Sequence, residues 1–291
     1  MKGIVLAGGT GSRLQPLTAV FSKQLLPVFD KPLIHYPVST LMAAGIREIL
    51  VITSPQDEHL FKALLGDGSE IGVNFEFLSQ EKPAGIPQAF LIGENFIGED
   101  KVALILGDNI FFGSGLGRQL ATYKQTKGAL VFGYSVSDPE RYGVAEIDSN
   151  GKVLSIQEKP NQPKSNIAVT GLYFYDNSVI SRSKSLRPSA RGELEITDLN
   201  ESYLRSGELC LNLLPRGTAW LDTGTFGALH DASTFVRVIE ERQATKIACL
   251  EEIAWRNKWL SDEELEVLAL SKSRKNISTY LLGLLNQSTK S

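Results

Sequence analysis

The sequence predicts a doubly wound α/β fold with a mixed, mostly parallel central sheet and a helical C-terminal extension. Apolar, strand-like runs alternate with helix-like segments through the first half of the chain. These runs are apolar throughout instead of alternating with polar residues, which is typical of parallel strands buried on both faces. Further along, the Asn150-Gly151 pair between two strand-like runs predicts a hairpin, so we expect part of the sheet to be antiparallel.

The elements expected in the first half follow a strand–helix order. We expect strands at residues 3–7, 48–52, 73–78 and 102–106, and helices at residues 33–44, 57–65 and 87–96. Ligands of doubly wound sheets bind beyond the carboxyl ends of the strands. The turns after the first and the last of these strands, at residues 8–13 and 107–109, are therefore the candidate ligand loops.

The second half is expected to be richer in strands and to end in helices. We expect strands at residues 144–147, 153–157, 168–175 and 210–214, with a helix that starts near residues 193–198 and stops at Gly207. A long helix is expected at residues 226–244, and amphipathic helices follow residue 251, one of them at residues 262–270. Without a linker or an internal repeat, the chain reads as one catalytic domain, residues 1–245, with a helical extension, residues 246–291.

The composition is that of an ordinary soluble globular protein, with 291 residues, 42% hydrophobic and 22% charged. The formal net charge of −3 offers no overall attraction to nucleic acid or to an anionic membrane. Cys210 and Cys249 are the only cysteines and have no metal-ligand spacing. No basic region followed by a long apolar stretch opens the sequence. We therefore expect a cytoplasmic protein without nucleic-acid or membrane partners.

The turn after the first strand has the composition of a phosphate-binding loop. Gly8, Gly11 and Arg13 lie in it, and Lys23 follows shortly after. Glycines let the backbone approach a ligand closely, and backbone N–H groups and cations attract phosphate. The turn lacks the third glycine of the dinucleotide-binding fingerprint and the Gly-Lys-Ser/Thr of a P-loop. A turn that only reverses the chain remains the alternative.

Two aspartates are candidates for binding a metal ion. Asp108 follows the strand at residues 102–106, and Asp222 lies in the run Trp220-Leu221-Asp222-Thr223-Gly224. Mg²⁺ is commonly held by one or two carboxylates together with substrate phosphates. Each aspartate alone is also a common turn or helix-cap residue. Which of the two interpretations holds depends on the other candidate residues around them.

Glu158 and Lys159 follow the second strand of the expected hairpin. On a strand, neighbouring residues point to opposite faces, so the pair could be two solvated charges. Alternatively, Lys159 reaches a phosphate and Glu158 accepts hydrogen bonds from the hydroxyls of a sugar. The chain has no Gly-x-Ser-x-Gly motif and no Cys-x-x-Cys, which argues against covalent hydrolase and redox chemistry.

In this order the motifs resemble those of the sugar-phosphate nucleotidyltransferases, and most closely the thymidylyl branch. The motifs are Gly8-Gly9-Thr10-Gly11-Ser12-Arg13-Leu14, Ser22-Lys23-Gln24-Leu25-Leu26-Pro27, Leu106-Gly107-Asp108-Asn109, Glu158-Lys159-Pro160 and residues 220–224, with further support from residues 138–144 and 191–198. The resemblance covers essentially the whole chain. It implies a Rossmann-like three-layer α/β/α nucleotidyltransferase fold.

The resemblance also implies a reaction and a role for each matching residue. A phosphate oxygen of glucose 1-phosphate would attack the α-phosphorus of dTTP and release pyrophosphate, with Mg²⁺ as cofactor, as the first step of dTDP-rhamnose-type biosynthesis. The catalytic residues would be Arg13, Lys23, Asp108, Lys159 and Asp222. Asp108 and Asp222 would also be the ligands of the metal ion. The nucleotide would contact Gly8, Gly11, Arg13, Lys23, Gln24, Gln80, Pro83, Gly85 and Asp108, and the sugar phosphate would contact Asn109, Tyr142, Gly143, Glu158, Lys159, Val169 and Arg191.

Some implications reach beyond the site. Family members are usually homotetramers inhibited by a dTDP-sugar such as dTDP-rhamnose, and residues 246–252 resemble part of the regulatory region. Ala84 and Pro87 depart from the family pattern in the base-pocket segment, which leaves the preference for thymine over uracil open. The alternatives are a UTP-dependent or other sugar-1-phosphate nucleotidyltransferase and, in a different class, a sugar-nucleotide sensor without activity.

Overall fold

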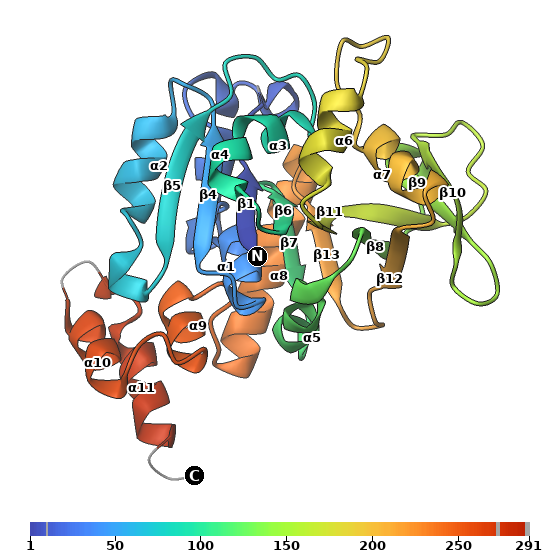
Figure 1. Cartoon of the computed structure of the whole chain (residues 1–291). Helices are drawn as coiled ribbons and strands as arrows, with labels where there is room; N and C mark the ends of the chain where they lie inside the picture. The colour runs from blue at the N-terminus through green and yellow to red at the C-terminus, as the bar shows by residue number, and fades with distance from the viewer. Residues whose placement is uncertain (10, 272–273, 289–291) are drawn as a thin grey trace.

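A nine-stranded mixed sheet forms the centre of the computed structural model, which describes residues 1–9, 11–271 and 274–288 (Figure 1). Four neighbouring strands are parallel, in the order β5-β4-β1-β6. Their bounds are Lys2–Leu6 (β1), Glu48–Thr53 (β4), Asn74–Ser79 (β5) and Val102–Leu106 (β6). The middle strands are buried on both faces, as their apolar sequences predict, and the parallel half of the expected sheet is confirmed.

Helices cover both faces of this sheet. Adjacent residues of β1 face opposite layers, because Ile4 belongs to one hydrophobic core and Val5 to another. The layer on the Val5 side contains α1 (His35–Ala43), α2 (Glu58–Leu65) and α5 (Leu116–Thr122). The layer on the Ile4 side contains α3 (Gln88–Ile92), α4 (Glu94–Ile97), α6 (Val179–Ser185) and α7 (Ile196–Arg205). The expected three-layer architecture is thereby confirmed.

The single helix expected at residues 87–96 is instead the pair α3 and α4. Gly93 separates them, and a Cβ there would lie 3.0 Å from Cδ2 of Leu50 on β4. The helix therefore breaks where its backbone comes close to the sheet.

The remaining strands make the other half of the sheet mostly antiparallel. Their bounds are Ala129–Ser135 (β8), Gly143–Ile147 (β9), Val153–Glu158 (β10), Ile167–Tyr175 (β11) and Leu209–Leu213 (β12). The expected hairpin is β9–β10, whereas β8 was not predicted. Along β11, residues Leu172–Tyr175 pair with β6, and Ala168 pairs with β9. Strand β9 thus pairs with the part of β11 that extends beyond its pairing with β6.

Two short antiparallel pairs lie outside the main sheet. They are β2 (Pro27–Val28) with β3 (Lys31–Pro32), and β7 (Asn109–Phe112) with β13 (Ala219–Asp222). In the second pair Asp222 lies opposite Asn109, which brings the two candidate metal-binding aspartates to one place. The long helix α8 (Phe226–Gln243), close to its expected bounds, packs over both pairs.

The C-terminal extension packs at the end of the sheet where β4 and β5 begin (Figure 1). Its helices are α9 (Leu250–Arg256), α10 (Asp262–Leu270) and α11 (Ser278–Ser288). Asn257 donates a hydrogen bond to the carbonyl oxygen of Met42, at 2.8 Å, and Arg47 lies over the ring of Trp259. The predicted helix at residues 262–270 is confirmed, whereas the division into domains 1–245 and 246–291 stays a prediction. None of the helices in the described residues is long and apolar enough to span a membrane.

Candidate active site

The candidate loops meet at the carboxyl ends of β1 and β6. Strand β1 lies between β4 and β6, so the chain leaves β1 at a switch point of the parallel sheet. Gly8 follows β1, and Gly107 follows β6. A Cβ on Gly107 would lie 2.9 Å from the carbonyl oxygen of Leu6, which explains why only glycine fits between the two strand ends. The predicted position of the two loops at neighbouring strand ends is confirmed, whereas ligand binding by these loops stays a prediction.

A first cavity of about 240 Å³ lies over the Gly-rich turn. Its lining includes six of the sequence-predicted residues: Gly8, Gly11, Arg13, Lys23, Gln24 and Asp108. Gly11 has a φ of +57° and precedes the short 3-10 turn η1 (Ser12–Leu14), which carries the exposed Arg13. Within the described residues, the Arg13 guanidinium makes no ion pair. The turn therefore offers an unpaired cation to an anionic ligand.

Asp108 is held by neighbours on both of its carboxylate oxygens. Lys23, on the short turn η3 (Lys23–Leu25), donates to Oδ2 at 2.6 Å, and Asn109 Nδ2 donates to Oδ1 at 2.8 Å. Lys23 is only 9% exposed at its side chain, against 28% for Asp108. The Lys23–Asp108 pair therefore presents its carboxylate side to the cavity.

Asn109, which donates a hydrogen bond to Asp108, is itself held in a fixed orientation. Its Oδ1 accepts hydrogen bonds from Trp220 Nε1, at 2.6 Å, and from the Gly171 backbone N–H, at 3.2 Å. The residue is 3% exposed. These contacts orient the Asn109 amide so that its NH₂ group faces Asp108. The side chain thus has internal partners, and a direct contact of Asn109 with a sugar stays a prediction.

The surroundings of Asp222 disfavour the charged form of its carboxyl group. Burial, and secondly the charge of Asp108, raise the pKa of the Asp222 carboxyl. Lys23, Arg141 and the Gly224 backbone N–H, 3.0 Å from Oδ1, counteract only part of this effect. Two carboxylates that repel one another in a partly buried place are suited to share a cation.

A second cavity of about 260 Å³ adjoins the first and shares Gly8 and Gly9 with it. Seven sequence-predicted residues line it: Gly8, Gln80, Pro83, Gly85, Glu158, Lys159 and Arg191. They come from the turn after β1, from the loop after β5, from the end of β10 and from the loop before α7. The structure thus gathers the residues assigned to the base and to the sugar phosphate around one opening.

Glu158 and Lys159 do not lie on opposite faces of a strand. Strand β10 ends at Glu158, and Lys159 has a φ of +40°, which breaks the strand alternation. The Lys159 ammonium lies 3.6 Å from Glu158 Oε1, and both residues line the second cavity. Thr197 donates to Glu158 Oε2 at 2.7 Å. The solvated-charge interpretation is therefore wrong for the direction of these side chains.

The other residues assigned to the sugar lie around this pair. A Cβ on Gly143 would lie 3.4 Å from Glu158 Oε2 and 4.0 Å from Cβ of Val169. The Tyr142 ring packs on Trp220, with centroids 5.2 Å apart, and burial raises the pKa of the Tyr142 hydroxyl. Arg191 Nη2 forms an ion pair with Glu195 Oε2 at 2.7 Å. Arg191 would have to exchange this partner to bind a phosphate.

Several residues around the site were not singled out from the sequence. Trp220, Thr223 and Thr197 lie in the quoted motifs, but only the folded chain shows that they hold Asn109, Asp108 and Glu158. Gln88 accepts a hydrogen bond from Gln80. For the first three residues, the only indication in the sequence was their position inside a quoted motif. Such a position does not reveal which distant residue a side chain will contact.

Gly85 ties the two sides of the second cavity together. It forms an isolated bridge with Leu194, and the neighbouring Ala84 carbonyl accepts the Leu194 N–H at 2.8 Å. With a φ of +97°, a Cβ on Gly85 would overlap the Leu194 carbonyl group.

Gly85→Ala is therefore expected to destabilise the fold by about 1–3 kcal/mol and to weaken nucleotide binding. Gly192→Ala is the matched control, because Gly192 has a φ of +77° and open space at its Cβ position. Chemical unfolding measures both variants. Equal losses in the two would show that φ alone, and not the contact with Leu194, explains the effect.

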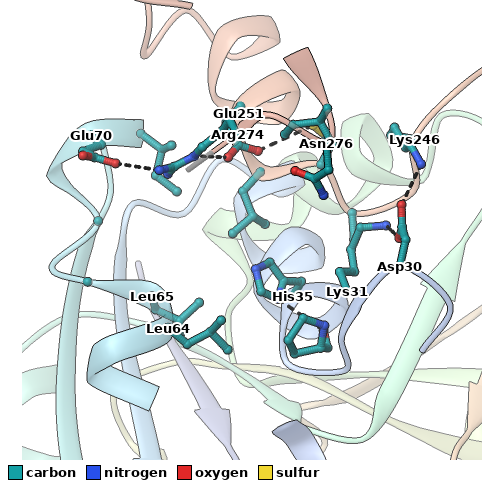
Figure 2. Close-up of a pocket in the computed structure, with 18 of the residues that line it drawn as sticks. Asp30, Lys31, His35, Leu64, Leu65, Glu70, Lys246, Glu251, Arg274 and Asn276 are labelled. Carbon is teal, nitrogen blue, oxygen red and sulfur yellow. Dashed lines mark hydrogen bonds and ion pairs between the residues drawn. The ribbon is translucent and has the colours of Figure 1, made fainter. Parts of the chain in front are cut away.

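A larger cavity of about 610 Å³ lies away from this site, beside residues 246–251 (Figure 2). Lys246 Nζ lies 2.6 Å from Asp30 Oδ2, and Arg274 lies between Glu70 and Glu251, at 3.1 and 2.9 Å. Burial lowers the pKa of the His35 imidazole at the same cavity. Its cations are paired with carboxylates, so an anionic ligand would have to displace those partners.

The chain belongs to the nucleotidyl transferase family, because the model of that family matches residues 2–238. The position of the two cavities at the switch point of an α/β sheet agrees with a nucleotide-binding member of that class.

Named relatives and a solved structure show which members of this family the chain is similar to. The chain is 57% identical over 288 residues to glucose-1-phosphate thymidylyltransferase of Neisseria meningitidis serogroup A, covering 99% of this chain and 100% of the relative. It is 55% identical to the protein of the same name in Mycolicibacterium smegmatis, with 99% and 100% coverage. A crystal structure of a Bacillus anthracis protein described as a glucose-1-phosphate thymidylyltransferase, in complex with sucrose, matches with a TM-score of 0.75 and 47% identity, covering 81% of this chain and 95% of that one.

Proposed function

We propose that this chain converts dTTP and α-D-glucose 1-phosphate into dTDP-glucose and pyrophosphate. The observation that carries the proposal is the pair of adjoining cavities: Arg13, Lys23 and Asp108 line the first, and Gln80, Glu158 and Lys159 line the second. The relatives with 55–57% identity over nearly the whole chain support the same reaction. A nucleotide that spans both cavities, with its phosphates over the Gly-rich turn and its base at Gln80, would meet the sugar phosphate bound at Lys159 close to Gly8 and Gly9.

Charge stabilisation is the main contribution that such a reaction needs. A phosphate oxygen of the sugar phosphate attacks the α-phosphorus of the nucleotide, and the bond to the leaving pyrophosphate breaks, so no covalent nucleophile on the protein is required. Two like charges about 4 Å apart repel by about 4 kcal/mol at an effective dielectric constant near 20. Arg13 and Lys23 would offset that repulsion on the nucleotide, and Lys159 would do so on the sugar phosphate.

Asp108 and Asp222 are the residues that would hold Mg²⁺. No cluster of three or more His, Cys, Asp or Glu side chains suited to a metal occurs in the part of the chain that the structure describes. Two carboxylates fit an ion that takes its remaining ligands from phosphates and water. When bound, the ion would neutralise charge that develops on the phosphates. The support for a cation between the two is their proximity, because Asp222 lies opposite Asn109, the neighbour of Asp108, in the β7–β13 pair.

Glu158 is suited to recognise the sugar. Its carboxylate is oriented by Thr197 and faces the same cavity as Lys159, so hydroxyls of a hexose could donate to the free lone pairs. Lys159 and Arg191 would bind the phosphate of the same ligand. Arg191 is available for this once it leaves Glu195.

The proposal is tested by pyrophosphate release. The protein is incubated with Mg²⁺, glucose 1-phosphate and each of dTTP, UTP, ATP, CTP and GTP. We expect release with dTTP above all others and none without metal. Release with UTP at an equal or higher rate would favour the uridylyl alternative, and nucleotide binding without release under any condition would favour the sensor.

We also propose that the protein is a cytoplasmic homotetramer inhibited by dTDP-rhamnose. The support is the family likeness of residues 246–252, part of which lines the large cavity of Figure 2. Light scattering measures the oligomeric state, and the pyrophosphate assay with added dTDP-rhamnose measures the inhibition.

A further inference from the structure

We propose that Gln88 is a positioning residue for base selection, because it fixes the side-chain amide of Gln80 in one of its two orientations. The inference rests on the proposed function and deepens it. Gln80 lines the second cavity beside Gly8, where the base of the nucleotide is proposed to bind. Which edge of Gln80 faces that base decides which bases can pair with it.

A backbone group determines the orientation of Gln88. The Ala84 N–H lies 3.0 Å from Gln88 Oε1. A backbone amide nitrogen can only donate a hydrogen bond, so the atom of Gln88 that meets it must be the carbonyl oxygen. The reversed amide would place two donors against one another.

The orientation of Gln88 then determines that of Gln80. The same Gln88 Oε1 also accepts a hydrogen bond from Gln80 Nε2, at 2.6 Å. Only the NH₂ group of Gln80 can donate to this oxygen. Because the Ala84 N–H and the Gln80 NH₂ group both donate to the same Gln88 oxygen, the Gln80 amide cannot turn over without losing its partner.

The result is an acceptor presented to the cavity. Gln80 Oε1 points away from Gln88 toward Gly8 and lies 2.5 Å from the position that a Cβ on Gly8 would take. No residue in the described ranges donates a hydrogen bond to this oxygen, although Gln80 is only 5% exposed. Gln80 Oε1 is not among the buried polar atoms without a partner in the described residues, so it is open to the cavity and free to accept a hydrogen bond from a ligand.

Pyrimidine bases differ in whether ring nitrogen N3 donates or accepts a hydrogen bond. Thymine and uracil carry a hydrogen on ring nitrogen N3, whereas cytosine has an unprotonated N3 that can only accept. A Gln80 fixed with its oxygen toward the base selects the first two and disfavours cytosine. If Gln80 could turn over freely, it would meet either kind of base equally well.

Gln88 lies on a rigid support. It is the first residue of α3 and follows Pro87, and the next two residues, Ala89 and Phe90, are fully buried. Because the helix start is fixed in the core, the Gln88 oxygen stays at one place, which a loop residue could not ensure.

The test compares Gln88→Met with Gln88→Glu. Methionine has a similar length but no strong acceptor, while glutamate keeps an oxygen for both donors. Equilibrium binding of dTTP and of dCTP is measured by calorimetry, and turnover of dTTP with glucose 1-phosphate is measured in parallel. We expect Gln88→Met to reduce the preference for dTTP over dCTP roughly tenfold, and Gln88→Glu to preserve it.

A double-mutant cycle separates positioning from a general structural effect. In a Gln80→Ala background, Gln88→Met should change the dTTP/dCTP binding ratio no further, because the side chain that it positions is gone. An unchanged ratio in Gln88→Met alone, or an equal loss in the Gln80→Ala background, would overturn the inference. Absence of turnover by the wild type would overturn the proposed reaction, and the binding ratios would still decide the role of Gln88.

Discussion

Asp108→Asn is expected to lower turnover on the order of 10³-fold while the chain still folds. The substitution keeps the shape of the side chain and removes its charge, so a metal ion loses one of its two carboxylates. It also disturbs the apo site, because Asp108 accepts a hydrogen bond on each oxygen, from Lys23 and from Asn109. An asparagine has one acceptor oxygen and leaves one of these donors without a partner. We expect a loss of stability of about 1–3 kcal/mol.

Pyrophosphate release and thermal unfolding measure the two effects. Asp100→Asn is the matched control. Asp100 lies just before β6 and Asp108 just after it, and Asp100 forms an ion pair with the Met1 amino group at 3.3 Å. That variant also loses an ion pair but should keep full activity. Activity retained in Asp108→Asn would mean that Asp108 is only a turn residue that anchors Lys23.

Asp222→Asn is expected to lower turnover by about 10²–10³-fold and, unlike Asp108→Asn, to raise the stability of the fold. Burial and the charge of Asp108 raise the pKa of Asp222, so its ionised form destabilises the folded state near neutral pH. Asparagine removes that charge and keeps an acceptor for the Gly224 N–H, which lies 3.0 Å from Oδ1. Opposite changes in stability from two aspartates of one site would identify a site built for function at the expense of stability.

The gain from Asp222→Asn depends on pH with a definite sign. Because the folded pKa of Asp222 lies above the unfolded value, the folded state holds this proton more tightly. The resulting stability is fully present below the unfolded pKa and is lost as pH rises through the folded pKa. Urea unfolding at about pH 4 and about pH 8 should therefore show a larger gain for Asp222→Asn at the higher pH. A variant less stable than the wild type at about pH 8 would mean that Lys23 and Arg141 outweigh the burial.

Periodicity and turn chemistry were enough to predict most regular elements. The strand Val102–Leu106 and the helix Asp262–Leu270 have the predicted bounds. Both depend on local patterns: an apolar run for a strand buried on both faces, and a capped amphipathic run for a helix. Strand β8 was not predicted, and β7 and β13 have only four residues each, which is too short for a periodic signal.

The site could be predicted as a set of residues but not as a set of contacts. Motif order indicated Asp108, Asp222 and Lys159, and the structure places them around two adjoining cavities or directly beside them. The direction of Lys159 was not predictable, because a φ of +40° overrides the alternation of a strand. Their roles in the reaction stay predictions that the variants above test.

By itself, the sequence determined the α/β class, the Gly-rich turn after the first strand and the chemical types of the side chains around the candidate site. Only the tertiary structure decided that Trp220 donates a hydrogen bond to Asn109 beside Asp108, and that Gln80 donates one to Gln88. Local elements follow from residues a few positions apart, whose spacing the sequence displays directly. Pairings such as Asp222 with Asn109 depend on the register of distant strands, which all the packing in the core determines together.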